Sequence, residues 1–285
     1  MSVNKILHWY RFSFLLLLLV SVTGYYGCEN GINIFSLQDD VQLGEQLVQE
    51  MKANTAEFPV FTKDPSVKKY IEEKVFAHIL ETPAIKNKTT YRYSIEIIDN
   101  PEVMNAFALP GGPIYVYTGL LKYLDSEAAL AGVLAHEIAH IEERHATERM
   151  TKYYGVQFLL SLILGDSPSQ IAEVAANFFV GAAFLANSRS DEDEADLRSM
   201  EYLRSSRYYA GGVKFFFEKM RDDGLVKNNS SKIETFLSTH PEPVERIKVT
   251  EERLKNWNLP VLSHKDAGDG IFRDEYAVNI KNKLK

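Results

Sequence analysis

The hydrophobic and polar positions along the chain follow mainly a helical pattern. Apolar residues recur at helical spacing in several segments, and some of these carry acids or proline in the first turn, which is typical of helix starts. The predicted helices are residues 36–54, 64–80, 126–150, 153–164, 169–186 and 187–203, a helix that follows Gly211, and one that follows a loop within 238–257.

Two segments show the alternation that is typical of strands. "YRYSIEIID" (91–99) alternates, and "NAFALPGGPIYVYTGLL" (105–121) holds two short extended pieces around a turn at Gly111 and Gly112. We therefore predict an α+β fold that is mostly helical, with a small antiparallel sheet. Residues 259–285 have no strong pattern, and we expect them to form a C-terminal tail of unknown role.

The N-terminus has the outline of a signal peptide. Lys5 and Arg11 precede an apolar run, residues 12–22. The run is shorter than the roughly 18 residues of a spanning helix, so a permanent transmembrane anchor is the less favoured alternative. We predict a signal peptide over residues 1–27.

The single cysteine of the chain, Cys28, follows this segment directly. A lone cysteine after a small residue resembles a bacterial lipobox, in which the cysteine is lipidated and becomes the first mature residue, although Tyr25 stands where leucine is usual. We expect residues 28–36 to be a lipidated tether that holds the protein at a membrane. A simple cleaved signal with an incidental cysteine is the alternative.

The composition suits one globular domain, which we place at residues 37–258. The chain has 285 residues, of which 45% are hydrophobic and 25% are charged. Its formal net charge is −7, and no block of lysine and arginine occurs. Because phosphate binding needs clustered cations, we expect no nucleic acid as a partner.

The segment "VLAHEIAHIEERHA" (133–146) contains an HExxH pattern within one predicted helix. His136 and His140 are four residues apart, so one helix face offers both imidazoles to one metal ion. Glu137 lies one step round the helix, where it reaches the water that such an ion activates, as a general base must. An ordinary charged helix is the alternative, since the pattern arises by chance in roughly 1–2% of such sequences.

A third ligand is expected further along the chain. Ala146 stands where a metzincin would have its third histidine, and residues 153–165 contain no acid. In the following acidic cluster, "DEDEAD", only Glu192 has another carboxylate four residues later, Asp196. Because a second carboxylate at this spacing holds a ligating histidine in its correct tautomer, we predict Glu192 as the third ligand and Asp196 as its neighbour. A solvated helix face is the alternative.

Four blocks of sequence, in the same order, are similar to one family. "NAFALPGGPIYVYTGLL", "LAGVLAHEIAHIEERHA", "SRSDEDEADLRSMEYL" and "THPEPVERI" resemble the HtpX/BepA/Oma-type zinc metallopeptidases, gluzincins of family M48, over roughly residues 36–256. The resemblance implies a zincin-type fold with an HExxH active-site helix and one Zn²⁺ per chain. It assigns the metal to His136, His140 and Glu192, and the catalytic base to Glu137, with Asp196 beside the site.

The resemblance also implies a function. Because no multi-span membrane domain or tetratricopeptide tail is apparent, we expect the short periplasmic lipoprotein branch of the family. The expected activity is that of a zinc-dependent endopeptidase of the bacterial cell envelope. A non-catalytic, chaperone-like lipoprotein and a gluzincin oligopeptidase or aminopeptidase are the alternatives.

Zincins hold their substrate in an extended conformation against an edge strand. We expect this strand to be "GGPIYVYTG", with its backbone offered by Gly111, Gly112, Ile114, Tyr115 and Val116; a plain turn at the two glycines is the alternative. Backbone recognition of this kind favours extended segments. Unfolded or misassembled envelope proteins are therefore the expected substrates.

His240 in "THPEPVERI" has three interpretations. Neighbouring prolines stiffen its loop, and a neutral imidazole is a good zinc ligand, so His240 would enter the open position on the metal and latch the enzyme off. Standing just outside, it would instead stabilise the tetrahedral intermediate together with Arg246. The third interpretation is a helix-start motif in which His240 only bonds backbone. The BepA-like resemblance favours the latch.

Overall fold

The computed structural model describes residues 32–156, 187–226 and 231–284, together with some positions between 158 and 174. The predicted signal peptide, Cys28, and most of the predicted helices 153–164 and 169–186 lie outside these residues. No helix among the described residues is both long and apolar enough to span a membrane.

The helices of the first half of the chain follow the predicted pattern. α2 (Leu37–Ala53) begins at Ser36, whose side chain and that of Asp39 form a capping box. A second helical rod starts after Asp64 with proline in its first turn, as predicted. It consists of α3 (Pro65–Tyr70), the π-helical η1 (Ile71–Phe76) and α4 (Ala77–Leu80).

The sheet is mixed rather than antiparallel, which corrects the predicted topology. Its strands β1 (Ser94–Ile98), β2 (Ala106–Ala108) and β3 (Pro113–Tyr117) lie in the order β1-β3-β2. β3 pairs antiparallel with β2 through a tight turn, and parallel with β1. After β1 the chain crosses to the far edge before it turns back, so β3 inserts between the other two strands. An alternating pattern identifies strands but not their neighbours.

β3, which we predicted as the edge strand that holds the substrate, is therefore the central strand of the sheet. β3 is hydrogen-bonded on both sides, and Ile114, Tyr115 and Val116 are all buried, so this strand has no free backbone edge. β2 lies at the edge of the sheet beside α6 (Glu127–Glu142), and its Phe107 and Ala108 are only partly buried.

The predicted turn at Gly111 and Gly112 joins β2 to β3. Both glycines have positive φ, 74° and 127°. A Cβ atom on Gly111 would lie 2.5 Å from the Cα of Val41 in α2. Glycine is required here because the turn is left-handed and lies directly against a helix backbone.

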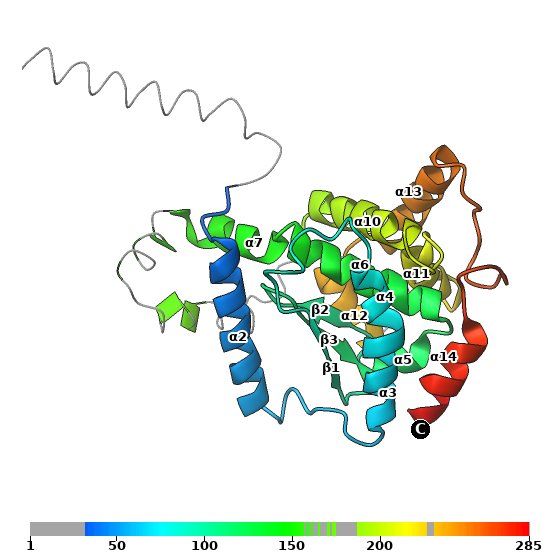
Figure 1. Cartoon of the computed structure of the whole chain (residues 1–285), viewed down its shortest axis with the longest axis horizontal. Coiled ribbons are helices and arrows are strands. Elements are labelled where there is room, and N and C mark those ends of the chain that lie inside the picture. Colours follow the sequence, from blue (N-terminus) through cyan, green and yellow to red (C-terminus); the bar gives the residue numbers. More distant parts are fainter. Residues whose placement is uncertain are drawn as a thin grey trace, which may run out of the picture.

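Helix α6 runs through the middle of the molecule (Figure 1), and all but its last residue are buried. Its first turn is capped by Ser126, whose hydroxyl accepts a hydrogen bond from the Ala129 amide. α10 (Arg189–Arg204) and α11 (Gly212–Asp222) pack against it. Since α6 carries the HExxH residues, the core of the fold holds these side chains in place.

The predicted helix 126–150 is in fact two helices. α6 ends at Glu142, Arg144 adopts a left-handed conformation with φ 63°, and α7 (His145–Tyr154) follows. The Nε atom of Arg144 donates to Asp40 Oδ2 at 2.6 Å, and its guanidinium also donates to a backbone carbonyl near the start of α2. These long-range bonds hold a conformation that a local pattern does not indicate.

Among the described residues, the other helices before the tail are α5 (Thr118–Tyr123), α12 (Ser231–Thr239) and α13 (Pro243–Asn256). The tail that follows α13 is ordered. It contains α14 (Arg273–Asn279) and the 3₁₀ turn η2 (Lys281–Lys283), and it packs against the same hydrophobic core as the rest of the chain (Figure 1).

Candidate active site

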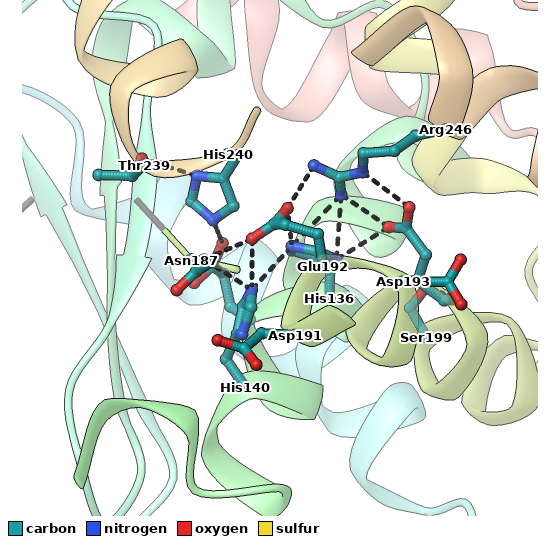
Figure 2. Close-up of polar contacts among 12 residues, drawn as sticks. His136, His140, Asn187, Asp191, Glu192, Asp193, Ser199, Thr239, His240 and Arg246 are labelled. Atoms are coloured by element: carbon teal, nitrogen blue, oxygen red, sulfur yellow. Dashed lines mark hydrogen bonds and ion pairs between the residues drawn. The ribbon is translucent and has the colours of Figure 1, made fainter. Parts of the chain in front are cut away.

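Three predicted ligands meet in the interior. α6 presents His136 and His140 from one face, and the first turn of α10 presents Glu192 (Figure 2). The Nε2 atoms of the two histidines are 3.0 Å apart. The Glu192 carboxylate oxygens lie 3.5 Å from His136 Nε2 and 3.3 Å from His140 Nε2. All three side chains are buried.

The start of α10 explains how Glu192 reaches this point. Ser188 caps the helix and forms a capping box with Asp191, which fixes the direction of the first turn. Glu192 follows within that turn and therefore points back toward α6.

The three side chains fit a zinc ion. The Nε2 atoms of the two imidazoles and the carboxylate oxygens lie close together in the protein interior. A cation placed between them would bind all three side chains. Two nitrogen ligands and one carboxylate oxygen are a common zinc set that leaves one position open. Among the described residues, these three and His240 form the group of potential ligand atoms that lie within 4.8 Å of one another.

Each histidine is also held at its other ring nitrogen. His136 Nδ1 lies 3.0 Å from Asp196 Oδ1, the neighbour that the i, i+4 spacing predicts. His140 Nδ1 lies 2.7 Å from Nδ1 of His145, whose Nε2 in turn lies 3.5 Å from Glu194. When the outer nitrogen donates a proton in such a contact, the inner Nε2 keeps its lone pair for a metal.

Arg246 binds two carboxylates of α10, those of Asp196 and Glu192. It donates to both oxygens of Asp196 at 2.7 Å and forms an ion pair with Glu192. Burial raises the pKa of Asp196, but the Arg246 guanidinium outweighs this effect, so the pKa is lowered and Asp196 stays ionised. The structure thus places Arg246 as a residue that positions Glu192 and Asp196.

The predicted base, Glu137, is buried beside the ligands. Its Oε1 lies 3.5 Å from His240 Nε2. Burial raises the pKa of Glu137 to about 8 in the metal-free protein, while His136 acts in the opposite direction. A carboxylate that is easily protonated is suited to take up a proton and release it again.

His240 immediately follows α12 and faces the same point. Its Nδ1 contacts the Thr239 hydroxyl at 2.8 Å, and its ring stacks on Phe236 with centroids 4.9 Å apart. Burial lowers the pKa of His240 to about 3, so the ring is neutral. Because Nδ1 contacts Thr239, the other ring nitrogen, Nε2, is directed at Glu137 and the ligand cluster.

Three residues near the site were not predicted from the sequence as site residues. Asn187 donates through Nδ2 to Glu192 and contacts His140 Nε2 at 3.2 Å (Figure 2). His145 supports His140, and Arg149 lines the adjoining cavity. For Asn187, the only signal in the sequence was its position next to a helix cap, and for His145 its position shortly after HExxH. Neither position reveals which side chains the residue contacts.

A cavity of about 270 Å³ opens beside the site. Glu137, His140 and His240 line it, together with Ala108 and Leu109 at the end of β2. Its apolar wall comes mainly from α2 and the segment after it and from β2, with side chains of Leu47, Met51, Phe58 and Phe107. Gly111, Gly112, Ile114, Tyr115 and Val116 are not among the residues that line it.

An HExxH helix whose two histidines meet a glutamate from a later helix, with a buried carboxylate beside them, defines the gluzincin class of metallopeptidases. The chain belongs to peptidase family M48, whose sequence profile matches residues 65–254. The family predicted from the sequence is thereby confirmed.

Relatives of known name agree with this assignment. The chain is 31% identical over 173 residues to the mitochondrial metalloendopeptidase OMA1 of Schizosaccharomyces pombe, which covers 60% of this chain and 49% of that protein. It is 26% identical over 236 residues to the beta-barrel assembly-enhancing protease of Escherichia coli, covering 80% of this chain and 46% of that protein. The chain thus spans about half the length of these relatives.

Proposed function

We propose that this protein is a zinc-dependent endopeptidase of the bacterial cell envelope that cleaves unfolded or misassembled proteins. The convergence of His136, His140 and Glu192 beside the buried Glu137 carries the proposal. The names of the similar proteins, a metalloendopeptidase and a protease that enhances beta-barrel assembly, support it.

The chemistry divides between the metal and the chain. When bound, zinc polarises a substrate carbonyl and makes the attacking water more acidic. Glu137 accepts the proton of that water and delivers it to the leaving amine. Asp196 and Arg246 keep His136 and Glu192 in place throughout.

The substrate would lie in an extended conformation along β2. This edge strand ends at the residues that line the cavity next to Glu137. A strand of three residues offers few backbone bonds, so the substrate must supply an extended segment without structure of its own. Unfolded or misassembled proteins provide such segments.

We assign His240 the latch role, as a fourth ligand that closes the site. Its Nε2 belongs to the ligand cluster, and its neutral ring suits a metal. Replacing His240 with alanine should therefore raise proteolytic activity. A lower rate would show that His240 stabilises the intermediate, and an unchanged rate with unchanged zinc affinity would leave only a structural role.

Attachment to the membrane would depend on Cys28. A single acyl chain holds a protein only marginally, whereas several chains anchor it firmly. Mass spectrometry of the mature protein should find an acylated N-terminal Cys28. An unmodified N-terminus beyond Cys28 would refute this part of the proposal.

The central experiment combines metal analysis of the purified protein with casein digestion, with and without a chelator. We expect about one zinc per chain and digestion that the chelator abolishes. Glu137→Gln should keep zinc and fold but lose digestion, because the amide preserves shape and cannot accept a proton. Glu192→Ala should lose zinc, with Asp193→Ala, which removes an exposed carboxylate of the same helix, as the matched control.

The alternatives give different results in this experiment. If intact casein is spared and short peptides are cut, the protein is an oligopeptidase or aminopeptidase. If neither is cut but unfolded proteins are bound, it is a chaperone-like lipoprotein. Undiminished turnover in Glu137→Gln would contradict the mechanism.

A further inference from the structure

Arg149 in α7 is a partly buried cation beside the active site. Its guanidinium Nε is buried and has no hydrogen-bond acceptor among the described residues. Within the described part of the chain, no carboxylate lies at ion-pair distance from it. The two other arginines near the site differ, since Arg144 binds Asp40 and Arg246 binds Asp196.

This side chain lines the cavity beside the active site. Glu137, His140 and His240 line the same cavity. Burial lowers the pKa of Arg149, and the negative charges that act against this effect are Asp191, Glu192 and Glu137.

These three carboxylates already have other partners. Asp191 caps α10 at the backbone of Ser188, and Glu192 is bound by Arg246 and Asn187. Glu137 faces His240 at 3.5 Å and is the proposed base. Arg149 is therefore close to negative charge but forms no ion pair with any of these three carboxylates.

A partly buried guanidinium with a buried, unsatisfied Nε is costly, and a carboxylate is the group that best removes this cost. Guanidinium carries five N–H donors in a fork that matches a carboxylate in two-point contact. Hydrogen bonds between charged groups are stronger than those between neutral ones, and more so in an apolar surrounding. The surrounding here is largely apolar, with Leu47, Met51 and Phe107 on the cavity wall.

We propose that Arg149 binds a carboxylate of the substrate next to the scissile bond, while the apolar wall of the cavity receives a neighbouring hydrophobic side chain. The preferred substrate segment thus combines an apolar residue with a negative charge. The inference rests on the proposed peptidase function and specifies its substrate class. The carboxylate comes either from an aspartate or glutamate side chain or from the C-terminus of the substrate.

Peptide binding to the zinc-loaded Glu137→Gln protein tests this without cleavage. The probes are fluorescent peptides with a leucine or phenylalanine whose neighbour is glutamate, glutamine or lysine, each with a free or an amidated C-terminus. The parent should bind the best carboxylate peptide at least about tenfold more tightly than its neutral counterpart. Loss of this preference on amidation identifies the C-terminus, and loss on exchange of glutamate for glutamine identifies a side chain.

Variants at Arg149 complete the test. Arg149→Gln in the same background should bind acidic and neutral peptides equally, and Arg149→Glu should prefer the lysine peptide. Lys152→Gln is the matched control, since it removes the same charge from an exposed position of α7 and should keep the preference. A preference that survives in Arg149→Gln, or a parent that has none, overturns the inference.

Cleavage of the same peptides by the protein with Glu137 restored separates the two proposals. Suppose that the Glu137→Gln protein binds acidic peptides preferentially, but the protein that has Glu137 cuts none of the peptides. The carboxylate site then stands and the peptidase proposal fails. If all peptides are cut at equal rates, the peptidase proposal stands and the carboxylate site fails. An equal loss of rate on acidic and neutral peptides in Arg149→Gln also overturns the inference, because Arg149 would then act on the reaction.

Discussion

At the scale of single residues, the two histidines of the proposed metal site are supported in different ways. The outer nitrogen of His136 meets Asp196, which is buried and bound by Arg246. The outer nitrogen of His140 meets His145, which leads to Glu194 at the surface, 34% exposed. A contact from His145 is the main cause that lowers the pKa of Glu194. His140 is thus held by a chain of side chains that ends in solvent.

His145 is expected to position His140 for the metal. His145→Ala removes the partner of His140 Nδ1 and should weaken zinc binding by about 10- to 100-fold, as measured by competition with a chromogenic chelator. His145→Asn keeps an acceptor near the same place and should restore most of the affinity. If asparagine rescues nothing while both variants melt at the parent temperature, the positioning role is wrong.

Zinc binding should depend on pH through His136. Burial lowers the pKa of His136, but hydrogen bonds with Asp196 and Glu192 outweigh this and raise it to about 9 in the metal-free protein. Below that pH the ring carries a proton that zinc must displace. The zinc affinity should therefore rise as pH increases from 7 to 9, by up to about tenfold per unit for one proton, and level off above 9.

Glu137→Gln is the background for this measurement, since Glu137 also titrates, near pH 8. Calorimetry in buffers of different ionisation enthalpy should count about one proton released per zinc at pH 7. Asp196→Asn removes the carboxylate that holds the proton, so its pH dependence should move to lower pH. An affinity that stays constant between pH 7 and 9 would contradict the assignment.

At the scale of elements, the crossing of α6 and α11 determines how rigidly the ligands are held. A Cβ atom on Gly132 would lie 2.2 Å from the Val213 amide nitrogen, and one on Gly212 would lie 2.2 Å from the Ala128 carbonyl oxygen. The two helix backbones are therefore in contact one turn before His136. Any side chain at this crossing must push the helices apart.

Gly132→Ala should lower the free energy of unfolding by about 1–3 kcal/mol or more, although alanine is the better helix former. The clash is with backbone atoms, which no side-chain rotation relieves. Denaturant unfolding of the zinc-free protein measures the change. Gly268→Ala, in a loop where the added Cβ would meet only side-chain atoms, is the control and should change little. A neutral Gly132→Ala would show that α6 and α11 shift easily.

The helices and strands differ in how well the sequence predicts them. HExxH, and the spacing of Glu192 and Asp196, are local patterns within single helices, and the structure brings these residues together as predicted. The strand order and the break at Arg144 depend on long-range contacts, for example with Asp40, which no periodicity contains. Contacts made by Asn187, His145 and Arg149 likewise arise only once α7 and α10 lie beside α6.

At the scale of the whole molecule, the tail completes the active-site helix. The backbone carbonyls of Ile271 and Phe272 accept hydrogen bonds from the first-turn amides of Ala128 and Glu127, at 3.1 and 3.2 Å. These amides at the start of α6 would otherwise lack partners inside the helix. The match to family M48 ends at residue 254, yet the hydrophobic core continues to Leu284.

Tyr276 is expected to be the main anchor of this tail. Its ring is fully buried, and its hydroxyl donates to the Leu121 carbonyl at 2.6 Å. Tyr276→Ala should lower the free energy of unfolding by about 3–5 kcal/mol, as the loss of a large buried ring does. Tyr276→Phe removes only one hydrogen bond and should cost about 1 kcal/mol. Val278→Ala, at an exposed position of the same helix, is the control and should cost almost nothing.

Zinc affinity of the same variants distinguishes a tail that supports the site from a separate appendage. Because the tail bonds to the first turn of α6, loss of Tyr276 should destabilise the helix that carries both histidines. Unfolding should then remain a single transition, and Tyr276→Ala should also release zinc at a lower denaturant concentration than the parent, by the same shift as the unfolding midpoint. Two separate transitions, with zinc kept through the first, would show that residues 271–284 fold independently of the active site.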